Sequence, residues 1–197
     1  MELMQTKFRV MLVDDNAERS QMLEQTLLAD QHVIVARLNT RVDLLSQVHL
    51  YKPEVIFIDV EAPGRETLDS LGQIYREQPL PVVLFAARSD VDTTRRALHA
   101  GVSAYVIDGL HPARIGALLE VAIARFETQQ TLRHELDAAR NRLADQRDIE
   151  KAKGLLMKRR NLDEAAAFAL LRRMAMDRQQ RIGEFARSLI SAADVLK

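Results

Sequence analysis

The strongest constraint on the fold is the alternation of short apolar runs with helix-like segments across the first 125 residues. Five runs rich in β-branched residues occupy residues 8–13, 33–36, 55–58, 81–85 and 104–107. Amphipathic segments lie near residues 17–29, 41–50, 66–77, 91–99 and 112–126. Apolar strands separated by helices are typical of a parallel sheet covered on both faces. Residues 1–125 are therefore expected to form a flavodoxin-like, doubly wound α/β domain with strand order 2-1-3-4-5.

The chain beyond this domain is expected to be helical. Residues 112–159 contain Pro and Gly only at Pro112, Gly116 and Gly154, which predicts one long helix. Within it, apolar residues follow the 4-3-4 spacing of a coiled-coil seam at Leu132, Leu136, Ala139 and Leu143. Residues 126–148 are therefore expected to be a coiled-coil linker helix. The seam is short, so it either pairs two copies of the chain or packs on its own domain.

A small third region, residues 149–197, is expected to be a three-helix bundle. Asn161 is the predicted N-cap of a helix over residues 162–178, with the acid Glu164 at the third helical position. Residues 179–181 are predicted to form a turn before the last helix. Phe168 and Phe185 are expected in the core. The inward-facing positions of the bundle are predicted at Leu155, Leu156, Leu170, Leu171, Met174, Ile182, Phe185 and Leu189.

Charge is distributed unevenly along a chain whose formal net charge is zero. Residues 1–125 hold 13 Lys/Arg and 17 Asp/Glu, residues 126–150 hold 4 and 6, and residues 151–197 hold 11 and 5. The corresponding net charges are −4, −2 and +6. An acidic front and a basic tail suggest a control domain joined to a polyanion-binding domain, with nucleic acid as the polyanion. The alternative is a basic solvated helix face without a ligand.

Composition excludes several function classes. The chain has no Cys, which rules out disulfides, thiolate metal sites and cysteine nucleophiles. Aromatic residues make up 5% and Trp is absent, so a surface built mainly on base stacking is not expected. Neither a signal peptide nor a membrane span is recognisable in the sequence. The protein is therefore expected to be cytoplasmic, without a membrane partner.

Three carboxylates are expected to converge at one edge of the predicted sheet. Asp14 and Asp15 end the first strand and Asp59 ends the third. In the order 2-1-3-4-5 these strands are neighbours, so the three side chains meet at the switch point of the sheet. Clustered hard oxygen ligands suit Mg²⁺, which offsets the repulsion between them. The alternative is that they are solvated strand ends. No cofactor is expected to be required, and Mg²⁺ is the one ion that this cluster predicts.

Residues 7–125 resemble the receiver domain of response regulators. The resemblance rests on Asp14, Asp15 and Asp59 together with the approach to the fifth strand, Gly101–Ile107. It implies that Asp14 and Asp15 hold metal positions and that Asp59 holds the phosphoacceptor position.

The chain departs from the receiver pattern at two positions. The family has Ser or Thr at the end of the fourth strand, where this chain has Ala86 followed by Ala87. The family has Lys followed by Pro after the fifth strand, where this chain has Asp108 and Gly109. An anion in place of the cation would repel a phosphoryl group of about −2 charge. We therefore expect an atypical receiver that docks proteins and is not controlled by phosphorylation of Asp59.

The basic tail resembles the ANTAR domain, a three-helix RNA-binding module of bacterial antiterminators. The resemblance rests on Ile149–Met157, Asp163–Ala165, Leu170–Met176 and Phe185–Ala186. Basic side chains are expected to hold RNA by its phosphates, while small residues keep the surface low. The predicted RNA-contacting residues are Lys151, Ala152, Lys153, Gly154, Lys158, Arg159, Arg160, Arg172, Arg173 and Ala175. The small residues among them fit tight helix packing equally well.

The combination of an atypical receiver with an ANTAR domain resembles the NasT-like antiterminators of nitrate and nitrite assimilation operons. The resemblance implies a non-enzymatic protein that binds tandem hairpins in a leader RNA and prevents termination. It further implies sequestration by a nitrate- or nitrite-sensing regulatory protein, and we expect a homodimer when the protein is active. The alternatives are a response regulator activated by phosphorylation of Asp59 and a DNA-binding regulator.

Overall fold

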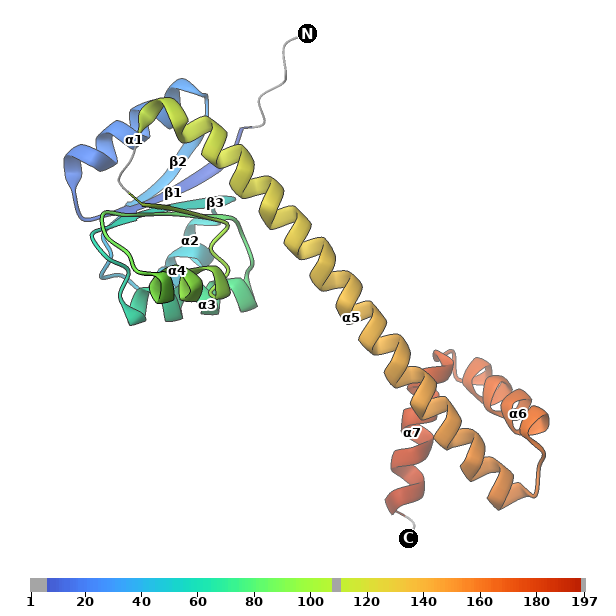
Figure 1. Ribbon diagram of the computed structural model, residues 1–197. Coiled ribbons are helices and arrows are strands. Elements are labelled where there is room, and N and C mark those ends of the chain that lie inside the picture. Colours follow the sequence, from blue (N-terminus) through green and yellow to red (C-terminus); the bar gives the residue numbers. More distant parts are fainter. Residues whose placement is uncertain (1–6, 108–110, 196–197) are drawn as a thin grey trace. The chain divides into compact units, whose positions relative to one another are not determined.

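The structure is a computed structural model that describes residues 7–107 and 111–195 (Figure 1). The chain divides into two compact units, Met1–Gln129 and Gln130–Lys197. The first unit contains a five-stranded parallel sheet with flanking helices, and the second is helical. Each unit has its own apolar core.

The sheet has the strand order β2-β1-β3-β4-β5, as predicted. All four neighbouring pairs are parallel. Its strands are β1 (Arg9–Asp14), β2 (Val33–Leu38), β3 (Val55–Val60), β4 (Val82–Ala86) and β5 (Ala104–Ile107). The central strands β3 and β4 are buried along their whole length, which explains why their sequences are apolar without alternation.

Helices cover both faces of the sheet. The helices of this unit are α1 (Ala17–Ala29), α2 (Leu44–Tyr51), α3 (Arg65–Glu77) and α4 (Val91–His99). Met11 and Val13 of β1 belong to the core with α2, α3 and α4, whereas Val10 and Leu12 belong to the core with α1 and the start of α5 (Ile115–Arg160). Alternate residues of one strand thus serve opposite faces, as the two-residue period of a strand requires.

The predicted long helix is present and begins after a short 3-10 turn. The turn η1 spans Pro112–Arg114, and α5 then runs for 46 residues as one helix. Two further helices follow, α6 (Glu164–Asp177) and α7 (Ile182–Val195). Residues of α5, α6 and α7 share one core around Leu156, Leu171 and Phe185.

The structure corrects three details of the predicted bundle. The N-cap of α6 is Asp163, whose side chain accepts a hydrogen bond from the Ala166 amide. Asn161 instead has a positive φ of 50°, a conformation that Asn tolerates better than most residues. Leu155 is only partly buried and is not a member of the bundle core, and Phe168 is exposed.

Within the described residues, no helix is both long enough and apolar enough to cross a membrane.

Candidate functional site

The acidic end of the sheet forms because β1 and β3 pair in register. Asp14 and Asp59 are direct partners across the two strands. Their side chains are almost fully buried, with exposures of 2% and 3%. Two carboxylates are thus held side by side at the carboxyl edge of the sheet, where the sequence predicted them.

A basic side chain lies between these two carboxylates. The Arg19 guanidinium lies 3.3 Å from Asp14 through its terminal nitrogen and 3.3 Å from Asp59 through Nε. Asn16 caps the helix by accepting a hydrogen bond from the Arg19 amide, which fixes Arg19 on the first turn of α1. Sequence reasoning missed Arg19. The available signal was that Arg19 is the one cation in the segment 17–29 and follows Asn16, a residue type that commonly caps helices, by three positions.

Burial dominates the electrostatics of Asp59. Desolvation raises the pKa of Asp59 to about 6, against a smaller lowering by Arg19 and a further raising by the Asp14 charge. A carboxyl with this pKa still carries its charge for most of the time at pH 7. The buried pair of carboxylates is therefore only partly compensated by Arg19.

Asp15 belongs to a different network. Its carboxylate accepts hydrogen bonds from the Thr40 amide at 2.9 Å and from the Thr40 hydroxyl. These bonds lower the pKa of Asp15 below its usual value. The three predicted aspartates therefore lie at the same edge of the sheet. Asp15 is hydrogen-bonded to Thr40, whereas Asp14 and Asp59 pair with Arg19.

The residues at this edge do not fit a resident Mg²⁺ ion. Arg19 already pairs with both Asp14 and Asp59, and Thr40 already bonds Asp15. Among the residues that the structure describes, no group of three or more carboxylate, imidazole or thiol side chains is arranged to hold a metal ion. The sequence-based expectation of a Mg²⁺ site is not supported by this geometry.

This chain departs from the receiver pattern at two places, and the structure describes the first of them. Ala86 pairs with Val60 at the end of β4 and is fully buried, so a methyl group stands where the family has a hydroxyl. Asp108 and Gly109 lie outside the described residues.

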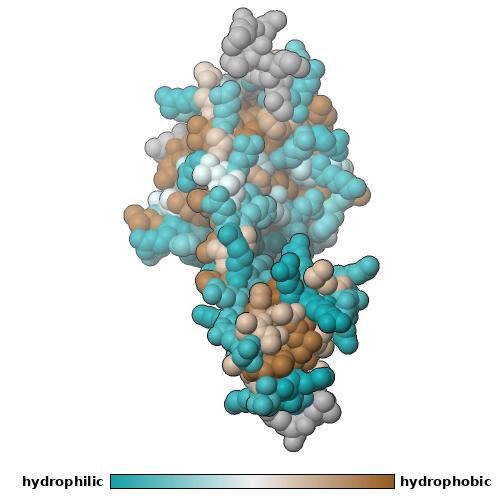
Figure 2. Space-filling view, turned by 90° about the vertical axis from the view of Figure 1, so that its right-hand side faces the viewer, coloured by the Kyte–Doolittle hydropathy of each residue, from teal (hydrophilic) through white to brown (hydrophobic). Residues whose placement is uncertain are grey.

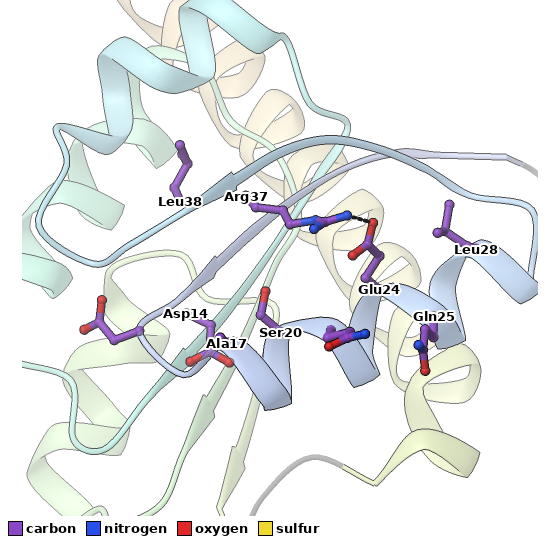
Figure 3. A pocket seen from close by; sticks show the side chains of 10 residues that line it. Asp14, Ala17, Ser20, Glu24, Gln25, Leu28, Arg37 and Leu38 are labelled. Atoms are coloured by element: carbon purple, nitrogen blue, oxygen red, sulfur yellow. Dashed lines mark hydrogen bonds and ion pairs between the residues drawn. The ribbon is translucent and has the colours of Figure 1, made fainter.

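An open groove runs beside the acidic end, between α1 and β2 (Figure 3). Arg37 and Glu24 form an ion pair across it, and Asp14 and Ser20 line it as well. Arg37 has no ion pair with Asp14 or Asp59 within the described residues, so it differs in this respect from Arg19.

Six of the predicted RNA-contacting side chains are basic and exposed, and we call them the basic set. None of the six takes part in an ion pair within residues 7–107 and 111–195. Its members are Lys151, Lys158, Arg159 and Arg160 of α5 and Arg172 and Arg173 of α6. Unpaired, solvated cations of this kind are available to a polyanion.

Lys153 does not belong to this set. Its side chain is 10% exposed and its Nζ lies 2.8 Å from Glu150 and 2.7 Å from Glu164. The pKa of Lys153 is raised by these two hydrogen bonds. The Lys153 charge already joins α5 to the start of α6, so we do not include Lys153 in the proposed RNA interface.

The small residues are mostly packing residues. Ala152 and Ala175 are buried in the core of the helical unit, and Ala175 also lines a pocket with Phe168 and Arg172. Gly154 is partly buried, and a Cβ added to it would meet nothing within 4 Å. The predicted contact of Ala152 with RNA is corrected to close helix packing, and Gly154 and Ala175 stay candidate contacts.

An apolar surface next to the basic set was not predicted. Phe168 and Met176 of α6 are 43% and 66% exposed, and with Arg172 they line a shallow pocket. Figure 2 shows apolar surface framed by hydrophilic side chains on the helical unit. The positions 168, 172 and 176 are four apart, so this face could have been found from helical spacing.

Comparison with known families divides the chain in the same sense. Residues 10–120 match the response regulator receiver domain, and residues 137–190 match the ANTAR domain. The transcriptional regulatory protein PdtaR of Mycobacterium tuberculosis is 29% identical over 171 residues, which cover 87% of this chain and 83% of PdtaR.

Other similarities concern the first unit alone. A protein-glutamate methylesterase/protein-glutamine glutaminase of Hahella chejuensis is 34% identical over 108 residues, covering 52% of this chain but 29% of that protein. The signal receiver domain of a modulated diguanylate cyclase from Desulfovibrio desulfuricans has a TM-score of 0.55 at 15% identity, covering 63% of this chain and 99% of that one. The methylesterase match therefore carries no enzymatic activity over to this chain, and the structural match shows the receiver fold.

Proposed function

The chain belongs to the response regulator receiver family and carries an ANTAR domain at its helical end, and from this premise we propose that it is a transcription antiterminator that binds hairpins in a leader RNA. The basic set carries this proposal. Residues 151–197 have a net charge of +6, and six cations on α5 and α6 are exposed without an ion pair in the described part of the chain. Cations that stay solvated in the free protein gain affinity by releasing the counterions of RNA phosphates.

The apolar surface beside Arg172 supports recognition of a loop. Specific RNA recognition targets unpaired bases, which stack on aromatic side chains and guanidinium planes. Phe168 and Arg172 line the same pocket and offer both kinds of partner. A base from a hairpin loop would contact Phe168 while the basic set holds the phosphates on either side.

Charge reversal tests the RNA interface. Arg172→Glu and Lys158→Glu should each weaken binding of a fluorescent two-hairpin RNA, and the slope of log affinity against log salt should fall by roughly one for each phosphate that is no longer neutralised. Arg95→Glu, at an exposed position of α4, is the matched control and should bind like the wild type. Equal affinities of all these proteins, or equal affinity for duplex DNA at the same salt, would reject the proposal.

Loop recognition has a separate signature. Phe168→Ala should lower affinity for the hairpin RNA by up to about 1–3 kcal/mol, the range of one base–aromatic stack, and should leave the salt slope unchanged. An unstructured RNA of the same length should not distinguish Phe168→Ala from the wild type. If Phe168→Ala changed only the salt slope and left the affinity for the hairpin RNA unchanged, Phe168 would lie outside the interface.

The proposed control is contact with a regulatory protein and not phosphorylation. Asp59 is 3% exposed and paired with Arg19, and β4 ends in Ala86 without a hydroxyl. The resemblance to NasT-like proteins supports a nitrate- or nitrite-sensing partner and an operon of nitrate or nitrite assimilation as the target. Incubation with acetyl phosphate and Mg²⁺ followed by intact-mass measurement tests whether the protein is controlled without phosphorylation. Stoichiometric phosphorylation that changes RNA affinity would favour the alternative, a phosphorylation-activated regulator.

A homodimer formed by α5 is part of the proposal. The seam residues Leu132, Leu136 and Leu143 are large, apolar and exposed. Pairing two copies would bury this seam and present two RNA-binding units to tandem hairpins, which raises affinity by effective concentration. Leu136→Lys should give a monomer by light scattering and should lose the preference for two hairpins over one. A mutant that stays dimeric would place the interface elsewhere.

A further inference from the structure

We propose that the receiver carries its own cation: the Arg19 guanidinium occupies the place between Asp14 and Asp59 that a divalent ion would take, and it makes the acidic end independent of such an ion. Removing Arg19 should then create a divalent cation site where the wild type has none. The inference rests on the geometry of the first unit and not on RNA binding, so either can fail without the other.

The guanidinium is positioned to pair with two carboxylates at once. Its terminal nitrogen lies 3.3 Å from Asp14 and its Nε lies 3.3 Å from Asp59. Asp14 is fixed in turn, because its Oδ1 accepts a hydrogen bond of 2.7 Å from the Asn16 amide. One residue of α1 thus joins the ends of β1 and β3, the two strands that carry the carboxylates.

Charge explains why a cation is needed here. Asp14 and Asp59 are adjacent in register and 2% and 3% exposed, so their repulsion is weakly screened by water. An arginine is always protonated in proteins, so it supplies its charge at every physiological pH and in fixed ratio to the chain. A bound Mg²⁺ ion would instead depend on the concentration of free ion.

The oxygen atoms that would bind an ion are present once Arg19 is removed. Asp14 Oδ2 and Asp59 Oδ2 are buried and accept no hydrogen bond within the described residues. Hard divalent cations prefer such carboxylate oxygens. An ion entering the wild-type site would have to displace a guanidinium that is tethered to α1, whereas an ion entering a variant without this charge would meet two carboxylates without their counter-charge.

The pairs of Arg19 with Asp14 and Asp59 keep the charge of the acidic end constant. In a receiver with an ion between the carboxylates, the ion can also contact a phosphoryl group, because the ligands of Mg²⁺ typically include both carboxylates and phosphates. The Arg19 side chain makes its pairs without any such ligand. The state of the first unit would then change through protein contact and would not respond to the ion.

Binding of Mg²⁺ to the full chain and its variants tests the inference. In calorimetric titration the wild type should show no saturable binding at about millimolar ion. Arg19→Gln should bind Mg²⁺ at least about tenfold more tightly, a difference of about 1.4 kcal/mol. Arg37→Gln is the matched control, because it removes a nearby cation that lines the groove beside the acidic end and pairs with Glu24 instead, and it should behave like the wild type. Arg19→Gln combined with Asp59→Asn should lose the gained binding.

Two results would overturn the inference. One is saturable Mg²⁺ binding by the wild type with the affinity of Arg19→Gln, and the other is a folded Arg19→Gln that binds no tighter than the wild type. Circular dichroism establishes whether that variant is folded. If it is not, the melting temperature of the wild type still decides, because the inference predicts no rise with added Mg²⁺ and a clear rise would contradict it.

Discussion

Replacing Asp59 by Asn should stabilise the protein at neutral pH. The Asp59 carboxyl is buried beside Asp14, and its pKa is raised to about 6 from an ordinary value of 3.8. A raised pKa in the folded state means that the folded protein binds the proton more tightly than the unfolded chain does. The stability linked to this proton is complete below about pH 4 and is lost as pH rises through about 6. Asn has the shape of the protonated acid and never takes the charge.

The size of the effect follows from the pKa difference. The pKa of Asp59 is raised by slightly more than two units, and each unit corresponds to about 1.4 kcal/mol. Ionised Asp59 therefore lowers the free energy of unfolding by about 3 kcal/mol above pH 6. The lowering by Arg19 is already contained in this difference. Asp59→Asn should therefore gain up to about 3 kcal/mol in the free energy of unfolding at about pH 8, and almost nothing near pH 4.

Urea unfolding followed by circular dichroism, at a series of pH values and with EDTA present, measures this gain. The comparison is between wild type and variant at each pH, because other carboxylates also titrate. Asp92→Asn, an exposed aspartate on α4, is the control for loss of one charge and should show no pH-dependent gain of this size. A gain for Asp59→Asn that is absent at high pH, or that does not change with pH, would refute the reasoning.

Three further substitutions test the two units. Gly101→Ala should destabilise the receiver by about 1–3 kcal/mol in urea unfolding, since φ is 90° there and a Cβ would lie 2.3 Å from the Tyr75 ring. Phe185→Ala should cost about 3–5 kcal/mol in thermal unfolding of the helical unit, because this ring is buried among α5, α6 and α7. Lys153→Met should change RNA affinity in anisotropy titrations by less than about twofold, because the Lys153 charge is already paired within the protein.

The elements of the fold could be predicted because each depends on local periodicity. The helices at residues 17–29 and 91–99 begin and end where the pattern placed them, and the five apolar runs lie in the five strands of the parallel sheet. The start of α6 was misplaced because both Asn161 and Asp163 are good capping residues. The choice between them depends on where α5 ends, and Asn161 is used to leave that helix in a left-handed conformation.

The acidic end was predictable in part. Residue position along β1 and β3 was enough to bring Asp14 and Asp59 together, because parallel strands in register align their ends. The role of Arg19 was not predictable in this way, since it depends on the direction of one long side chain from a neighbouring helix. The same holds for Lys153, whose burial follows from how Glu164 at the start of α6 faces α5.

Single-round transcription through a leader with two hairpins before a terminator is the most direct test of the central claim. Added protein should raise the fraction of transcripts that read through the terminator, and acetyl phosphate should not change that fraction. Arg172→Glu should lose the effect and Arg95→Glu should keep it. Unchanged termination with the wild type, at concentrations that saturate the hairpin RNA, would contradict the claim that the basic helices act on transcription through RNA.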